Sequence, residues 1–227
     1  MGRLFDPESN IMQILTRYAT VFLCGMVWFV CCIPVITAGA STTAMHRMMF
    51  NLRQERPAGI GLFFKTFIKE FPKSTVLWLI DLLCVGLLYV LFCLTAPSGN
   101  EGAGIALLLV VFFLPFFLWM FTFAYVFPLT SFFENRILTT IWNGLLISIR
   151  YFRSTIPVLA LSMIPVIGFI ISEYYFIVLV PIWIMIIIPL IFYFQSYFFL
   201  KVFSDLIPGK PDSSLSEGSG SVDEITG

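Results

Sequence analysis

The sequence predicts an all-α membrane protein, a polytopic helical bundle of about five transmembrane helices with amphipathic helices at its cytoplasmic surface. Composition is the first reason, because 59% of the 227 residues are hydrophobic and only 11% are charged. Soluble domains carry about 25% charged residues. The second reason is that charge-free apolar runs of about 20 residues, enough for a spanning helix, recur along the chain. The formal net charge is zero, so we expect no nucleic-acid partner.

The five apolar runs define one membrane domain, residues 1–204. The first run could instead be a signal peptide, because Ala38-Gly39-Ala40 resembles a cleavage site. Its polar lead is not net positive and the run exceeds the usual 7 to 15 residues, which favours a membrane span. Residues 205–227 are expected to be a disordered cytoplasmic tail, because the end of the chain is rich in Ser, Gly and acidic residues. The predicted spans are residues 18–36, 74–96, 105–128, 154–172 and 174–200.

Three further segments have the pattern of amphipathic helices. In residues 41–54, three methionines and a leucine recur at positions i, i+3, i+4 and i+7. Residues 60–73 set a phenylalanine stripe against lysines. Residues 132–153 have a charge-free stretch, 137–149, that is too short to span. We expect all three helices to lie at the membrane interface or under the bundle.

The segment that joins the first apolar run to the first amphipathic helix is predicted to be a structural turn. Pro34 ends the run, Thr37 and Gly39 turn the backbone, and Ser41 is placed to cap the next helix. Such a helix start could also bind an anion through its N–H groups. The turn is expected at the cytoplasmic interface rather than at the midplane, which favours the cap and a close-packing turn.

Lys and Arg concentrate in loops that would share one side of the membrane. If the first span runs from outside to inside, the positive-inside rule is satisfied at every loop and only Arg3 and Arg17 lie outside. This places the N-terminus outside the cell membrane and the C-terminus in the cytoplasm. The residues we predict to dock a partner or anionic lipid are Arg47, Arg53, Lys65, Lys69, Lys73, Arg150 and Arg153.

Asp81 is the one carboxylate clearly inside a predicted span. Since a charge at that depth is costly, Asp81 either serves a proton or solute site or makes a structural hydrogen bond. His46, the sole histidine, lacks a partner at ligand spacing and is expected on a polar helix face. We predict no metal site and no cofactor, and the five cysteines show neither metal spacing nor a disulfide framework.

Three stretches carry a family resemblance. The sequence from Pro34 to Ala44 after a run that holds Trp28, the Phe-spaced basic segment 63–71, and Tyr125 to Leu129 followed by two asparagines resemble the YesL-like family. These are small bacterial integral membrane proteins described as a domain of unknown function. The resemblance spans residues 4–203 and implies an accessory role beside sugar importers, without catalytic residues. The two asparagines are Asn135 and Asn143.

No enzyme motif is found, including the nucleophile elbow, the P-loop and the zinc-protease helix, so we expect a protein without enzymatic activity. The leading hypothesis is an accessory or regulatory component of carbohydrate uptake, with sugar-importer subunits as partners. The alternative is a small self-contained transporter or channel, acting alone or as a homo-oligomer. A weak internal repeat, in which Lys73-Ser74-Thr75 and Arg153-Ser154-Thr155 each open a span, slightly favours the alternative.

Overall fold

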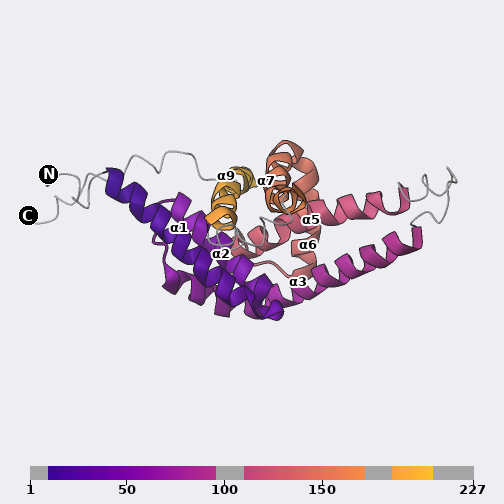
Figure 1. The fold of residues 1–227 in the computed structure, drawn as a ribbon, viewed down its shortest axis with the longest axis horizontal. Coiled ribbons are helices and arrows are strands. Elements are labelled where there is room, and N and C mark those ends of the chain that lie inside the picture. Colours follow the sequence, from indigo (N-terminus) through magenta and orange to yellow (C-terminus); the bar gives the residue numbers. More distant parts are fainter. Residues whose placement is uncertain (1–9, 96–109, 172–185, 207–227) are drawn as a thin grey trace, which may run out of the picture.

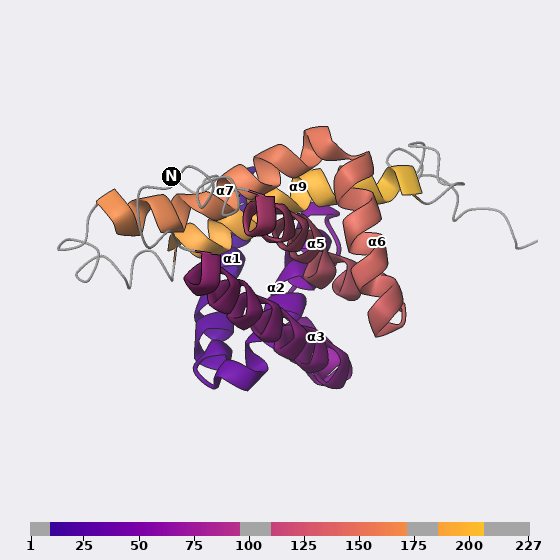
Figure 2. The same ribbon diagram turned by 90° about the vertical axis from the view of Figure 1, so that its right-hand side faces the viewer.

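The computed structural model describes residues 10–95, 110–171 and 186–206, and these parts form helices joined by turns, with no strand among them. The predicted all-α class is confirmed for them. Figures 1 and 2 show the helices in two perpendicular views. The elements are α1 (Asn10–Cys32), the 3-10 helix η2 (Val35–Thr37), α2 (Ala38–Arg53), α3 (Ile60–Thr95), α5 (Phe113–Phe132), α6 (Ile137–Arg150), α7 (Phe152–Ile171) and α9 (Ile188–Leu206).

Helix α2 is the centre of the described fold. It packs against α1, α3, α5 and α9, and its residues from Gly39 to Phe50 are nearly all buried. The prediction that residues 41–54 form an interfacial amphipathic helix is therefore wrong. The physical reason is that neighbouring helices contact both of its faces, so that its polar side chains bond to protein instead of water. Burial on all sides is what a helix in the core of a bundle requires.

Helices α3 and α5 form a long antiparallel pair, whose end projects to the right in Figure 1. Residues 60–73 and 74–96 were predicted as separate helices, but α3 continues through both with Pro72 inside it. At 1.5 Å per residue, its 36 residues extend about 54 Å, well beyond the roughly 30 Å of a bilayer core. Since the lysines of α3 all lie in its first half, only the second half suits lipid.

The chain turns sharply between α6 and α7, where the helix axes differ by 106°. Helix α6 is the core of the amphipathic helix predicted at 132–153, although residue 132 still belongs to α5. Helix α7 matches the predicted span 154–172. Helix α9 covers the end of the predicted span 174–200 and runs on to Leu206, into the segment expected to be tail. Residues 172–185 and 207–227 lie outside the described residues.

Two apolar clusters hold these helices together, and α2 contributes to both. One joins Phe50 of α2 to Tyr125 of α5 and to Phe199 and Phe203 of α9. The other joins the α2 methionines to α1 and to Phe63 of α3. Burying apolar surface contributes roughly 25 cal/mol per Å², so these contacts stabilise the arrangement of α1, α3, α5 and α9 around α2.

By length and composition, two of the described helices could cross a membrane, residues Ile60–Leu94 and Phe113–Phe132. The bent pair Ile137–Arg150 and Phe152–Gly168 is a third candidate, and Thr16–Cys32 is a shorter apolar helix. These helices indicate membrane association. The predicted number of five spans is not confirmed by them.

Candidate functional site

The turn between α1 and α2 is a close-packing structural turn. The Thr37 hydroxyl donates to the carbonyls of Cys31 at 2.5 Å and Pro34 at 2.7 Å. These hydrogen bonds stabilise the turn that follows α1. A Cβ on Gly39 would lie 2.6 Å from both the Ser74 carbonyl oxygen and the Trp78 Cβ of α3. Only glycine permits this approach of the two helices.

The prediction that Ser41 caps α2 is wrong. The N-cap residue is Thr37, in a helical conformation and without a side-chain cap hydrogen bond. Ser41 lies one turn further along and is buried, so its hydroxyl donates to the Trp28 carbonyl of α1 at 3.0 Å. Thr43 bonds with Ser74 of α3 at 2.9 Å. The hydroxyl groups of these two α2 residues therefore bond to neighbouring helices. The start of α2 packs on protein and does not offer its N–H groups to a ligand.

Arg47 and Arg53, two of the predicted docking residues, hold the fold together. The Arg47 guanidinium donates to the Ser131 carbonyl at 3.1 Å, at the C-terminal end of α5, where a cation also interacts favourably with the helix dipole. Arg53 donates to the Tyr193 carbonyl and the Ser196 hydroxyl of α9, both at 3.0 Å. Its guanidinium also lies 4.5 Å from the centre of the Tyr193 ring.

The three lysines of α3 have different surroundings. Lys69 forms an ion pair with Glu134, which lowers the pKa of the Glu134 carboxyl. Lys73 is half-buried, and Lys65 is exposed. Lys65 and Lys69 line a polar cavity of about 240 Å³ together with Arg47 and Glu134. Among the described residues, Lys65 makes no ion pair.

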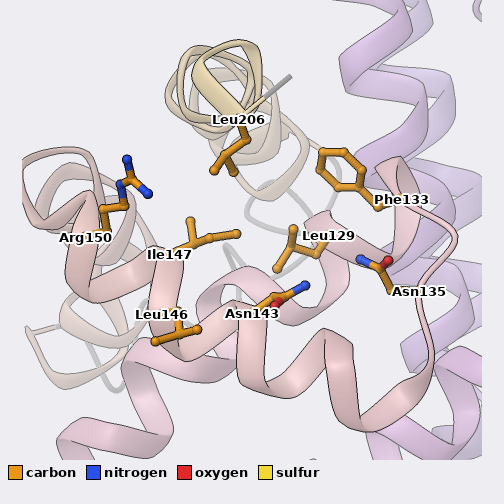
Figure 3. A pocket seen from close by; sticks show the side chains of 8 residues that line it. All are labelled: Leu129, Phe133, Asn135, Asn143, Leu146, Ile147, Arg150 and Leu206. Atoms are coloured by element: carbon orange, nitrogen blue, oxygen red, sulfur yellow. The ribbon is translucent and has the colours of Figure 1, made fainter. Parts of the chain in front are cut away.

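Arg150 and Arg153 flank the bend between α6 and α7, and both are exposed. Arg150 is part of a second cavity, of about 320 Å³, between the end of α5, helix α6 and the end of α9. Asn135 and Asn143 also line it, as Figure 3 shows. These asparagines were not predicted as site residues, although the family resemblance had singled them out. No periodicity in the sequence could show that they face one cavity.

The positive-inside argument placed Arg17 on the other side of the membrane from the arginines of α2. The structure places them on the same side. Its guanidinium forms an ion pair with Glu55 at 2.5 Å, and Glu55 immediately precedes Arg56. Both residues line a cavity of about 460 Å³ with Thr16 and Leu52. Since α1 and α2 run antiparallel, the start of the first and the end of the second share one side. The assignment of Arg17 and Arg56 to opposite sides is therefore wrong.

Asp81 is 8% exposed and lies on the second half of α3. The indole N–H of Trp119 on α5 donates to Asp81 Oδ1 at 2.9 Å. Sequence reasoning missed Trp119, because nothing local relates two residues on different helices of an antiparallel pair. The bond satisfies part of the hydrogen-bonding need of a polar group in an apolar span. Asp81 lines none of the three cavities given above.

His46 is buried rather than on a polar helix face, which corrects its predicted position. Its ring lies between the rings of Phe192 and Phe199 of α9 and near Phe50 of its own helix. Burial among these rings lowers the pKa of His46 to about 3. Within the described parts of the chain, its Nδ1 has no hydrogen-bond partner.

Among the described residues, no group of three or more His, Cys, Asp and Glu side chains could hold a metal ion. The five cysteines are free thiols, from the buried Cys24 to the exposed Cys93. The polar groups of the site are therefore hydrogen-bonding and cationic, and suited to binding an anion or a polar surface.

The fold and these side chains define a class, an all-helical membrane-associated protein whose basic residues divide between internal bonds and an exposed surface. Residues 21–92 match the model of the family described as "Protein of unknown function, DUF624". This is the YesL-like family, so the resemblance is confirmed over these residues. Comparison with curated proteins and with solved structures gave no match.

Proposed function

We propose that this chain is a multi-pass inner-membrane protein without enzymatic activity that serves carbohydrate uptake as an accessory or regulatory component, and that it docks a partner through exposed cytoplasmic cations. The apolar helices support the membrane part. The carbohydrate part rests on the family resemblance. Sugar-importer subunits are the partners that the resemblance implies, and the C-terminus is placed in the cytoplasm by the positive-inside rule.

One observation carries the docking part of the proposal. The basic residues divide into those that bond within the fold, such as Arg47 and Arg53, and those that are exposed without an ion pair among the described residues, which include Lys65 and Arg153. Cations that the fold does not use are free to meet an acidic partner surface, where they would act mainly on the association rate and on specificity. Lys65 and Arg153 are therefore the residues to test.

The test is co-purification from native membranes of cells grown with complex carbohydrate. Lys65→Glu/Arg153→Glu should lose importer permease or ATPase subunits that the wild-type chain retains. The control Lys65→Arg/Arg153→Lys keeps both charges and should retain them. This pair avoids Lys69 and Lys73, whose replacement would also disturb Glu134 or a half-buried site. Equal recovery with the Glu variant would overturn docking through these cations.

A self-contained transporter or channel is the second candidate, favoured by a single observation, the buried carboxylate of Asp81 in an apolar helix pair. Intramembrane carboxylates commonly mark proton or solute pathways. Liposomes that contain only this protein would then show solute flux that Asp81→Asn reduces. Trp119→Phe is the matched control, because it removes the indole donor to Asp81 and keeps the carboxylate. Absence of flux in wild-type liposomes would remove this candidate.

A further inference from the structure

The cavity beside α6 combines a polar side with an apolar floor. Its apolar lining comes from Leu129, Leu146, Ile147 and Leu206, which belong to three different helices. Its volume of about 320 Å³ lies at the lower end of the range of small-molecule sites, roughly 300 to 1,000 Å³. The cavity can therefore hold a headgroup and the beginning of a chain, but not a whole lipid.

Three polar side chains surround this floor. In Figure 3 the amides of Asn135 and Asn143 approach the cavity from the loop before α6 and from α6 itself, and Arg150 stands at the end of α6. Within the described residues neither amide makes a hydrogen bond and Arg150 makes no ion pair. Two carboxamides offer donors and acceptors, while a guanidinium matches the geometry of a phosphate. The cavity thus offers a cation at one end, at Arg150, and amide donors and acceptors further along α6.

The apolar floor continues into an exposed apolar face of α6. Leu146 lines the cavity and is itself 50% exposed, and the same outer face carries Leu138, Trp142 and Ile149. The opposite face of α6 packs on α5, where a Cβ on Gly144 would lie 2.9 Å from the Thr122 carbonyl oxygen. A helix with one face on protein, an exposed apolar face with a tryptophan, and arginines at its ends has the character of an interfacial helix.

We propose that this cavity binds the headgroup of an anionic phospholipid. Arg150 contacts the phosphate, Asn143 bonds to the ester or headgroup oxygens, and the acyl chains leave over Leu146 along the apolar face of α6. A freely soluble phosphate would use Arg150 but leave the apolar face unexplained. The inference rests on the part of the proposed function that places this protein in a membrane, and it is independent of any importer partner.

The test is lipid binding by the full-length protein in a neutral detergent, followed by native mass spectrometry. Phosphatidylglycerol should bind more tightly than phosphatidylcholine, because only the first carries a net negative charge. Arg150→Gln should weaken phosphatidylglycerol binding about tenfold, the effect expected for losing one charged hydrogen bond. Asn143→Leu, which fills the cavity and removes one amide, should weaken it similarly.

The matched control is Arg153→Gln, which removes the same charge three residues further on, outside the cavity lining. It should leave binding within about twofold, as expected for a surface charge outside the site. Equal losses in Arg150→Gln and Arg153→Gln would overturn the site in favour of diffuse attraction. Equal affinity for the two lipids would also overturn it.

Inorganic phosphate and glycerol 3-phosphate separate the two sources of a phosphate group. Millimolar amounts of either should not displace phosphatidylglycerol if the apolar floor contributes to binding. Displacement that is lost in Arg150→Gln would show a soluble-anion site and overturn the lipid assignment. A variant that loses lipid binding but still inserts into liposomes and still co-purifies with its partner leaves the proposed function intact. Failure of the lipid site and failure of the proposed function are therefore distinguishable.

Discussion

Helices α2 and α6 are two short helices with the same predicted role and opposite surroundings. Both were predicted as amphipathic helices at the membrane interface. Helix α2 is enclosed by α1, α3, α5 and α9, whereas α6 packs mainly on α5 and leaves an apolar face exposed. The comparison shows that the spacing of apolar residues in a sequence identifies the faces of a helix. It does not identify which parts of the protein cover those faces.

The polar residues of the two helices explain the difference. In α2, Thr43 bonds to α3, Arg47 to α5 and Arg53 to α9, so each of these three residues meets a group on another helix. In α6, the hydroxyl groups of Thr140 and Ser148 donate only to carbonyls of their own helix or its N-cap residue. Hydrogen bonds between helices are what allow a helix with polar residues to occupy the core.

The largest effect is expected where α2 approaches α3 most closely. Gly39→Leu should lower the free energy of unfolding by about 3 kcal/mol or more, because its side chain must displace backbone and the Trp78 Cβ. Thermal unfolding in detergent would measure the change. Gly61→Leu is the control, since a Cβ there meets no atom within 4 Å. Comparable losses for the two variants would show that the contact between α2 and α3 is not tight.

Local signals in the sequence predicted the all-α class, but Gly39, predicted to turn the backbone, lies inside α2. They did not predict that α3 is continuous, because the change from charged to apolar residues near Lys73 marks a change of environment and not a helix end. Nor could they pair Asp81 with Trp119, or bring Asn135 and Asn143 to one cavity. These depend on which helices pack together, which no local pattern contains.

Arg53 should show the next largest effect. Arg53→Ala removes two hydrogen bonds to α9 and the contact with the Tyr193 ring, and should cost about 2 to 3 kcal/mol of unfolding free energy. Arg53→Lys should restore little, because an ammonium lacks the planar fork. Arg150→Ala, the control on α6, should change stability by less than about 0.5 kcal/mol. A small effect of Arg53→Ala would mean that α2 and α9 are held by their apolar contacts alone.

Because His46 is buried with α2, the stability of the fold should depend on pH. Its pKa of about 3 in the folded protein lies below the unfolded value of 6.5, so the unfolded chain binds a proton first as the pH falls. Stability should therefore decrease below about pH 6.5 and be unaffected above it, with a loss of about 2 kcal/mol at pH 5. Unfolding curves of wild type and His46→Phe, compared from pH 8 to pH 5, isolate this contribution from all other groups. If the stability of the two proteins changes with pH in the same way, His46 is in contact with water and the prediction is wrong.

The smallest effect on stability is expected on the outer face of α6. Trp142 is 63% exposed, so Trp142→Ser should change the free energy of unfolding in detergent by less than about 0.5 kcal/mol. Met48→Ser on α2, where the side chain is 1% exposed, should cost about 2 kcal/mol or more. If Trp142→Ser is as destabilising as Met48→Ser, another surface covers the outer face of α6, and α6 is then a buried helix like α2.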